Sequence, residues 1–320
     1  MVINNPAEAR QAVRRVKSEG ADFVKVYNLL SRESFFAIVA EAKAQGLPIA
    51  GHVPYTIGAG EASDAGQHSI EHMDGILWAS SAQEDHIRSQ IGGLRPIPGS
   101  VPGALAPVSP ALLRDSFSME KLSALAERLK SNQTVVVPTL SLYRNRFEHR
   151  GERSVVSGPD RLQYVPAAYI QLWERRRGPT TEEEARLQFE QCLMVVRELQ
   201  RARVTVLAGT DVGTSYQLPG FSLHDELSLL VKAGLSEMEA LEAATRNSAR
   251  AFHLMDQGTI EPGMRADLVL LDSNPLENID NTRKIRTVVT AGRVFERNEL
   301  DMMLVEIRRA ASQWRGTPTL

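Results

Sequence analysis

The chain alternates between strand-like and helix-like segments over most of its length, and this alternation is the strongest constraint on its fold. Apolar runs of strand character are separated by amphipathic runs of helical character, the order that joins parallel strands. The predicted strands are 21–27, 47–53, 68–73, 134–140 and 204–211. Because crossover helices cover the faces of a parallel sheet, the pattern favours an α/β domain.

Composition excludes several classes of protein. Of the 320 residues, 42% are hydrophobic and 24% charged, as in ordinary globular domains, and the formal net charge of −2 suggests neither a nucleic-acid nor a membrane partner. No apolar window is long enough to cross a membrane and no signal-peptide pattern is visible, so we expect a soluble protein, cytoplasmic or exported. The single cysteine, Cys192, excludes a disulfide framework and is interpreted as a buried thiol.

Four chemically active side chains lie at or near the carboxyl ends of the predicted strands. Lys25 stands in the apolar strand FVKVY, and the others end the strands IAGHV, SIEHM and VLAGTD, namely His52, His72 and Asp211. In parallel barrels the active site forms at this end of the strands, because the strand-to-helix loops open there. If the sheet closes, these four side chains converge on one point.

Each of these residues also has a structural interpretation. An unpaired ammonium buried in a strand costs several kcal/mol, so Lys25 requires either a function or a structural ion pair. His52 and His72 can be core histidines that bond to backbone carbonyls, and Asp211 can cap the turn that follows it. His68 lies at the opposite end of its strand from His72 and is interpreted as structural.

Taken in order, these motifs resemble those of the amidohydrolase superfamily. FVKVY, GHV, SIEH and GTD, followed by LHDEL, ALEAAT and GTIEPGMRADLVLLD, are similar to its imidazolonepropionase-like and Xaa-Pro dipeptidase-like (prolidase-like) branch. The resemblance implies a metallo-dependent (β/α)8 hydrolase barrel with a small β-sandwich domain. We assign residues 1–255 to the C-terminal portion of the barrel, with a Gly/Pro-rich insertion at 83–118, residues 256–299 to part of the sandwich, and 300–320 to a terminal helix and tail.

The resemblance also implies roles for the four residues. Lys25 would be carbamylated and bridge two divalent ions, expected to be zinc; His52 and His72 would bind the second ion; and Asp211 would bind the first and act as general base. A metal-bound hydroxide would then attack the carbonyl of a small-molecule amide. A carbamate turns a buried cation into an anion that metal ions neutralise, which explains a lysine in an apolar strand.

One part of the family pattern is missing. Its first strand carries a His-x-His pair that holds the first metal ion, but no two of the seven histidines here are two residues apart. The predicted strands then correspond to strands four to eight, and five strands cannot close a barrel built for eight. We expect a truncated protein, half of a split enzyme completed by a second chain, or a rearranged oligomer. A chain that is catalytically incomplete, or only an assembly partner, is the alternative.

The substrate class depends on weaker signals. The leading expectation is hydrolysis of amide C–N bonds in dipeptide-like or cyclic substrates, with ester or lactone hydrolysis as the alternative. Side chains that can bind the substrate or line its pocket are Tyr143, Arg144, Arg146, His224, Glu226 and Tyr27. Each also has a structural interpretation: an exposed basic loop for the arginines, a helix-face charge for Glu226, and packing for Tyr27.

Overall fold

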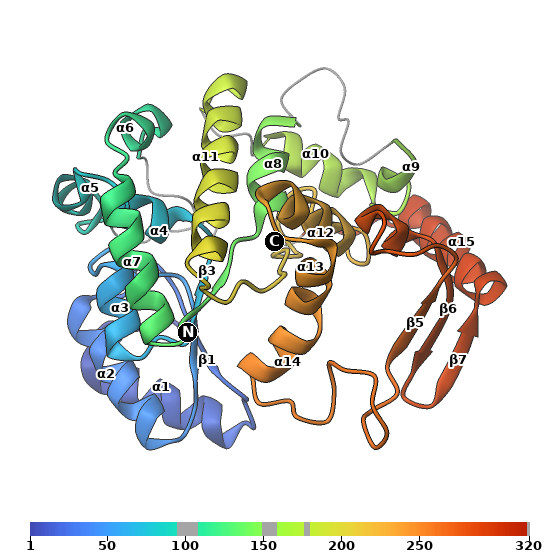
Figure 1. The fold of residues 1–320 in the computed structure, drawn as a ribbon, viewed down its shortest axis with the longest axis horizontal. Coiled ribbons are helices and arrows are strands. Elements are labelled where there is room, and N and C mark those ends of the chain that lie inside the picture. Colours follow the sequence, from blue (N-terminus) through green and yellow to red (C-terminus); the bar gives the residue numbers. More distant parts are fainter. Residues whose placement is uncertain (95–107, 149–158, 176–179, 319–320) are drawn as a thin grey trace. The chain divides into compact units, whose positions relative to one another are not determined.

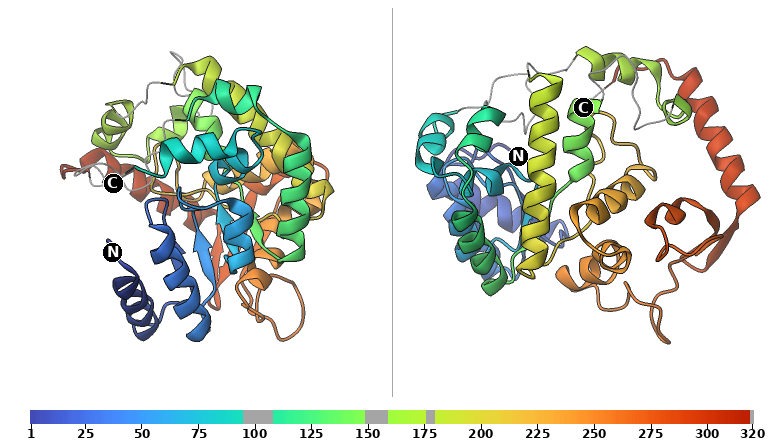
Figure 2. Two further views of the ribbon diagram at one scale, coloured as in Figure 1. Left: turned by 90° about the vertical axis from the view of Figure 1, so that its left-hand side faces the viewer. Right: turned by 45° about the horizontal axis from the view of Figure 1, so that its top comes forward.

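The computed structural model describes residues 1–94, 108–148, 159–175 and 180–318. These residues form two compact units, Met1–Thr139 with Gln191–Leu207, and Leu140–Glu190 with Ala208–Leu320. Helix α11 (Glu182–Arg201) contributes residues to both units and is yellow in Figures 1 and 2. No helix in the described ranges combines the length and the apolar character that a membrane crossing requires.

In the first unit, helices alternate with short strands. Several of these helices begin at a side chain that accepts hydrogen bonds from their first N–H groups, as Asn5 does for Ala7 and Glu8, and Ser31 for Ser34. The helices are α1 (Pro6–Ser18), α2 (Arg32–Ala44), α3 (Ala59–Ala65), α4 (Asp74–Ala79), α5 (Glu84–Ile91), α6 (Pro110–Asp115) and α7 (Met119–Ser131). The expected insertion 83–118 thus holds α5 and α6, and residues 95–107 between them lie outside the described part.

The strands of the first unit are parallel and follow one another in chain order. They are β1 (Val24–Val26), β2 (Ile49–Gly51), β3 (Ser69–Glu71) and β4 (Val135–Val137). β1 pairs with β2 and β3 with β4, and a bridge between Ile49 and Gln67 connects the two pairs. Parallel strands in chain order with a helix after each are the arrangement of a (β/α) barrel wall.

The predicted length of the fifth strand, 204–211, is wrong. Only Val206 bridges to Val136, through hydrogen bonds from Val136 N to Thr205 O and from Leu207 N to Val136 O, both 2.9 Å long. The next amide, that of Ala208, donates instead to Ala243 O. The backbone therefore leaves the sheet after one bridge, where the sequence favoured eight extended residues.

The prediction that FVKVY is buried is also wrong for most of the strand. Val26 is buried, but Phe23 and Tyr27 are 38% and 43% exposed, and Lys25 is exposed as well. β1 pairs with β2 along one edge, and in the described ranges its other edge has no strand partner. The side chains of Phe23, Lys25 and Tyr27 therefore reach solvent.

The core of the first unit lies between these strands and the helices that follow them. Ile70 of β3 and Val136 of β4 are fully buried, as are Phe35 of α2 and Leu122 of α7. Cys192 on α11 is 0% exposed, in agreement with its interpretation as a buried thiol.

The second unit is mainly helical around its own apolar cluster. Trp173, Tyr216 and Leu218 are buried together, with partly buried residues of α10 packed against them. Its helices are α8 (Leu140–Glu148), α9 (Pro159–Leu162), α10 (Ala167–Arg175), α12 (Ser222–Ala233), α13 (Glu237–Ala244), α14 (Arg246–Ala251), the 3-10 helix η1 (Ile279–Arg283) and α15 (Arg297–Gln313).

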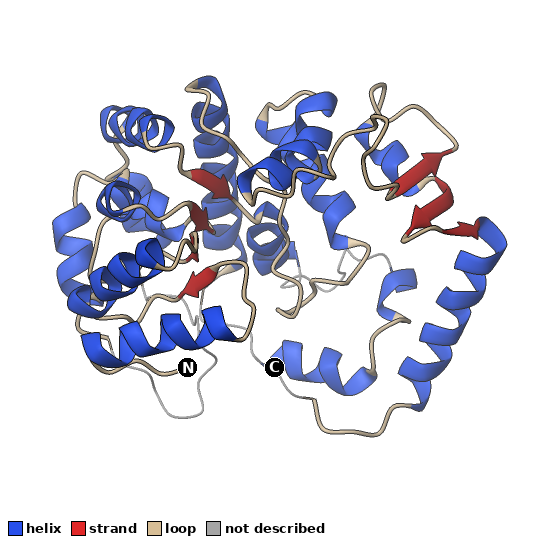
Figure 3. Cartoon of the chain, turned by 90° about the horizontal axis from the view of Figure 1, so that it is seen from below, coloured by secondary structure: helices blue, strands red, loops and turns tan. Residues whose placement is uncertain are grey.

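A small antiparallel sheet belongs to this second unit. Its strands lie in the order β5 (Leu268–Leu271), β6 (Ile285–Thr290) and β7 (Arg293–Glu296), side by side in Figure 3. The strands predicted within 256–299 are present and form one sheet of three strands in the described residues, and its assignment to part of a sandwich stays a prediction. Val269 and Val294 are 55% and 56% exposed, so apolar side chains of the sheet face solvent.

Candidate metal site

A cluster of metal-binding side chains lies at the carboxyl ends of β2 and β3. His52 follows β2, Glu71 ends β3, and His72 is the next residue. One ligand atom from each of the three lies within 4.8 Å of the others. His72 is buried, at 6% exposure, and the other two are half-buried. Two imidazoles and a carboxylate at this spacing are a donor set that suits zinc and similar divalent ions.

Two unusual backbone conformations build this cluster. Gly51 has a φ of 120°, and a Cβ there would lie 2.3 Å from Val26 O, so only glycine allows this approach of β2 to β1 just before His52. His72 has a φ of 67°. Successive strand residues ordinarily point to opposite faces, and the left-handed turn at His72 breaks that alternation. Glu71 and His72 can therefore reach the same point.

The two imidazole rings are held by neighbours. His72 Nδ1 lies 2.8 Å from Thr139 Oγ1, which leaves Nε2 as the ring nitrogen for a metal ion. The His52 and His72 ring centroids are 4.6 Å apart in an edge-to-face arrangement, and the His52 ring also stacks on Tyr27, at 4.6 Å. Tyr27 thus packs against a candidate ligand.

Lys25 reaches the same cluster. Its Nζ atom lies 2.6 Å from Glu71 Oε2, with side-chain exposures of 35% for the lysine and 17% for the glutamate. This is the ion pair expected if Lys25 is an unmodified ammonium. The structure therefore brings three of the four predicted site residues together in the first unit: Lys25, His52 and His72.

The electrostatics of the cluster favour a neutral His52. Burial, and next the positive charge of Lys25, lower the pKa of His52 to about 4. At neutral pH this imidazole is uncharged, the form in which histidine binds a metal ion.

Asp211, the fourth predicted site residue, belongs to the second unit. Its φ is 54°, and its backbone carbonyl accepts hydrogen bonds from the N–H and the Oγ1 of Thr214, at 3.3 and 2.9 Å. These two hydrogen bonds form a turn through the backbone of Asp211, and a capping role for its side chain stays a prediction. The roles of its carboxylate as metal ligand and general base stay predictions.

Apart from Tyr27, the predicted substrate-binding residues also lie in the second unit, where they make structural contacts. Tyr143 is 1% exposed, and the Arg146 guanidinium lies 4.3 Å from its ring centroid. Arg144 Nη2 is 3.0 Å from Asp225 Oδ2, a carboxylate that also pairs with Arg161 and Arg283. Asp225 and these three arginines form a partly buried ionic cluster, so Arg144 is not part of an exposed basic loop. Substrate binding by Tyr143 and Arg144 stays a prediction.

His224 and Glu226 flank Asp225 on α12. His224 Nδ1 lies 2.9 Å from Thr282 Oγ1, and its contact with substrate stays a prediction. Glu226 is 0% exposed, and its two carboxylate oxygens accept from Leu140 N and Ser141 N at 2.8 and 2.7 Å. It therefore caps the first turn of α8 and is not a charge on a helix surface. Burial raises the pKa of Glu226 to about 7, against the opposing effect of these two donors.

Sequence reasoning did not assign two residues of the cluster, Glu71 and Thr139. Glu71 lies beside His72 in the motif SIEH, which was a signal, but strand alternation places it on the opposite face. Thr139 lies two residues beyond β4, and nothing in PTL distinguishes its hydroxyl from that of any loop threonine.

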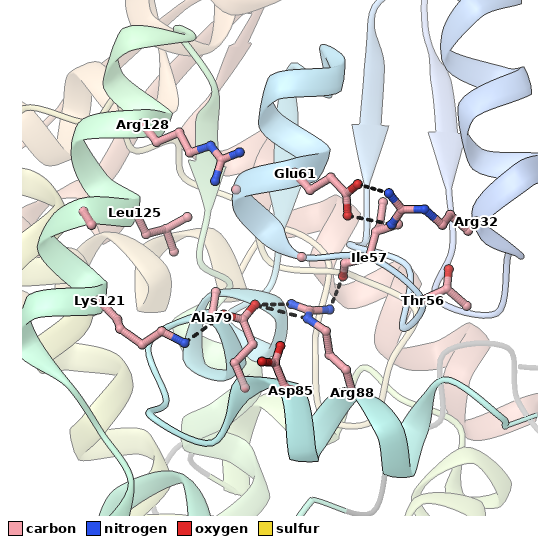
Figure 4. Close-up of a pocket in the computed structure, with 14 residues that line it drawn as sticks. Arg32, Thr56, Ile57, Glu61, Ala79, Asp85, Arg88, Lys121, Leu125 and Arg128 are labelled. Carbon is pink, nitrogen blue, oxygen red and sulfur yellow. Dashed lines mark hydrogen bonds and ion pairs between the residues drawn. The ribbon is translucent and has the colours of Figure 1, made fainter.

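A separate hollow of about 560 Å³ lies among α2, α3, α5 and α7 (Figure 4). Its walls carry charged side chains that pair with one another. Arg32 pairs with Glu61, and Arg88 and Lys121 both pair with Glu84, at 2.6 and 3.1 Å. Because these charges already have partners, we assign no ligand to this hollow.

Comparison with protein families identifies the family of this chain. The profile described as "Amidohydrolase family" matches residues 28–295, most of the chain. The chain belongs to the amidohydrolase family. An imidazolonepropionase of Pyrobaculum arsenaticum is 39% identical over 77 residues, which are 24% of this chain and 19% of that protein. An adenine deaminase of Rhizobium meliloti is 41% identical over 71 residues, 22% of this chain and 12% of the deaminase.

Solved structures of this family share the fold over nearly the whole chain. A bottromycin amidohydrolase superposes with a TM-score of 0.69 at 23% identity and covers 97% of this chain. A Xaa-Pro dipeptidase with bound methionine in its active site gives a TM-score of 0.60 at 22% identity and covers 92%. The match spans 63% and 59% of those two chains, so this amidohydrolase-family chain corresponds to about three fifths of each structural relative.

Proposed function

We propose that the chain is part of a metal-dependent hydrolase that cleaves amide C–N bonds in dipeptide-like or cyclic small molecules. The observation that carries this proposal is the His52, Glu71 and His72 cluster, whose ligand atoms lie within 4.8 Å of one another in a chain of the amidohydrolase family. Names among its relatives, imidazolonepropionase, adenine deaminase and Xaa-Pro dipeptidase, agree with reactions at C–N bonds.

The residues present suit a divalent ion, for which zinc is our proposal. His52 is neutral at pH 7 because burial and Lys25 lower its pKa, and Nδ1 of His72 is engaged by Thr139, so each ring offers one nitrogen. When bound, the ion supplies Lewis-acid chemistry that polarises a carbonyl and makes water a stronger nucleophile. In the carbamylated form Lys25 would add a carboxylate-like ligand.

Asp211 is proposed to take a proton from the attacking water and pass it to the leaving amine, as its place in the family motif GTD suggests. The first-unit strands are proposed to correspond to strands four to seven of the family barrel, and the segment around Val206 to strand eight. A second chain or a further copy would then complete the barrel wall beside β1. Tyr143, Arg144 and His224 remain proposals for substrate contact.

The decisive experiment is the zinc content of the purified chain after dialysis with zinc and bicarbonate, by elemental mass spectrometry. We expect stoichiometric zinc, and its loss in His52→Ala and in His72→Ala. His86→Ala, an exposed histidine on α5, is the matched control and should keep the metal. Zinc in the parent that does not exceed the level in these two variants would overturn the proposal.

The reaction class is tested on the zinc-loaded chain with a panel of dipeptides and cyclic amides, by release of amine. If the chain hydrolyses esters or lactones but no amide, the alternative substrate class, esters or lactones, is favoured. No turnover despite bound zinc would mean that the chain needs a partner to be active.

A further inference from the structure

Two residues in the left-handed backbone region meet beside the metal-binding cluster. His72 has a φ of 67° and Thr139 a φ of 49°. For a β-branched residue such as threonine this conformation is a genuine outlier and costs on the order of 1–3 kcal/mol. Glycine or asparagine would adopt it at less cost. A threonine at this position therefore calls for a compensating contact of its hydroxyl group.

That contact is with His72. Thr139 Oγ1 lies 2.8 Å from His72 Nδ1, and the two residues are only 3% and 6% exposed, so bulk water competes little for this hydrogen bond. The register of the sheet determines the pairing. Glu71 of β3 pairs with Val137 of β4, and His72 N donates to Val137 O at 2.9 Å. His72 thus lies directly after β3, and Thr139 lies two residues after β4.

We propose that Thr139 is a positioning residue that accepts a hydrogen bond from Nδ1–H of His72. A neutral imidazole carries one proton, so a proton held on Nδ1 leaves the lone pair on Nε2 for a metal ion. The opposite tautomer would place the proton on Nε2 and block that ligand. This inference rests on the proposed metal site and adds the group that selects the histidine tautomer.

A pair of variants separates the hydroxyl from the shape of Thr139. Thr139→Val keeps the β-branch and nearly the same volume but removes the hydroxyl, and Thr139→Ser keeps the hydroxyl and removes the methyl group. We expect Thr139→Val to weaken zinc binding by about 10- to 100-fold, the usual effect of losing a hydrogen-bond partner of a ligating histidine. Thr139→Ser should stay within about threefold of the parent, because it retains the acceptor. The dissociation constant is measured by competition with a chelator.

A second measurement reads the tautomer directly and needs no metal. In chains with ¹⁵N-labelled histidine, two-bond ¹H–¹⁵N spectra show which ring nitrogen is protonated, and His72→Ala assigns the signal. We expect His72 to be the Nδ1–H tautomer in the parent and in Thr139→Ser, and a mixture or the Nε2–H form in Thr139→Val. His86, exposed on α5, is the internal reference and should not change.

The outcomes are distinguishable. An unchanged tautomer in Thr139→Val, or equal loss of zinc affinity in both variants, would overturn the role of Thr139. A parent chain that binds no zinc would overturn the proposed function instead, and the tautomer of the metal-free chains would still decide the inference about Thr139.

Discussion

The Nζ atom of Lys25 lies 2.6 Å from Oε2 of Glu71, across β1 and β3 of the first unit. As an ammonium, Lys25 is attracted to this carboxylate. As a carbamate it would be an anion beside another anion, which is stable only if a cation lies between them. The ion pair and the proposed carbamate are therefore two exclusive states of the same lysine, and a bound metal ion would favour the carbamate.

This relationship makes Lys25→Ala informative. We expect the zinc content in bicarbonate to fall by at least about tenfold, since the variant loses a ligand and not merely a partner of one. Lys17→Ala, on α1, is the control and should bind as the parent does. If Lys25→Ala keeps its zinc, then His52, Glu71 and His72 suffice and the carbamate is wrong.

Gly51→Ala should disrupt the pairing of β1 with β2. The new Cβ would lie 2.3 Å from Val26 O at a φ of 120°, so both sterics and backbone conformation oppose it. We expect a loss of more than about 3 kcal/mol in the free energy of unfolding, measured by urea denaturation.

Gly46→Ala is its matched control. Gly46 also has a positive φ, 63°, but a Cβ there meets nothing within 4 Å. We expect a loss of only about 1 kcal/mol. Equal losses in the two variants would show that the contact with Val26 does not matter.

Glu226 should make the chain less stable as the pH rises. Burial raises its pKa to about 7, above the value of an unfolded glutamate, so the neutral form favours folding. This contribution is complete below about pH 4.5 and is lost as the pH rises through 7, amounting to about 3 kcal/mol. The test compares urea denaturation at pH 5 and pH 8.

Glu226→Gln is the control for that profile, because glutamine does not titrate. We expect the variant to be less stable, since it offers one acceptor to the two amides of Leu140 and Ser141. We also expect its free energy of unfolding to lack the decrease with rising pH that titration of Glu226 causes. A pH profile parallel to that of the parent would contradict the assignment.

Asp225→Asn should destabilise the second unit. The carboxylate is 6% exposed and pairs with Arg144, Arg161 and Arg283, so its removal leaves three guanidinium groups without their shared anion. We expect a loss of about 3–5 kcal/mol in the free energy of unfolding. Burial alone would raise the pKa of Asp225, but the arginines lower it overall, so the contribution is present at neutral pH and lost on acidification.

Asp280→Asn tests whether burial is the reason for the large loss of stability expected in Asp225→Asn. Asp280 also pairs with Arg283, at 3.1 Å, but its side chain is 56% exposed. We expect a change below about 1 kcal/mol, as for surface pairs. If Asp280→Asn loses as much stability as Asp225→Asn, then removal of a negative charge, and not its burial, determines the loss of stability.

The sequence predicted the strand order and part of the site because both depend on local patterns. Alternation of apolar strands and amphipathic helices indicated parallel pairing, and the strand-terminal positions of His52 and His72 indicated that they would meet. Lys25 reaches the same point. These features depend on which residues lie at the ends of the strands, and those residues can be identified from the sequence.

What the sequence did not predict depends on backbone conformation and on neighbours. Glu71 lies beside His72 in the cluster only because the left-handed φ of His72 breaks strand alternation. A left-handed conformation cannot be predicted from the presence of a histidine. Glu226 looked like a helix-face charge, yet it caps a helix that begins 86 residues earlier in the chain. The segment after Val206 has the composition of a strand but turns away, because Ala208 bonds to Ala243.

The small sheet has a consequence for handling the protein. β5 pairs only with β6 in the described residues, and Val269 and Val294 are more than half exposed. An edge of this kind offers unused N–H and C=O groups to any extended peptide, and its apolar side chains add adhesion. We therefore expect folded chains to associate edge to edge as their concentration rises, without prior unfolding. Dilute samples, or a lysine substituted on β5, would be the practical remedy.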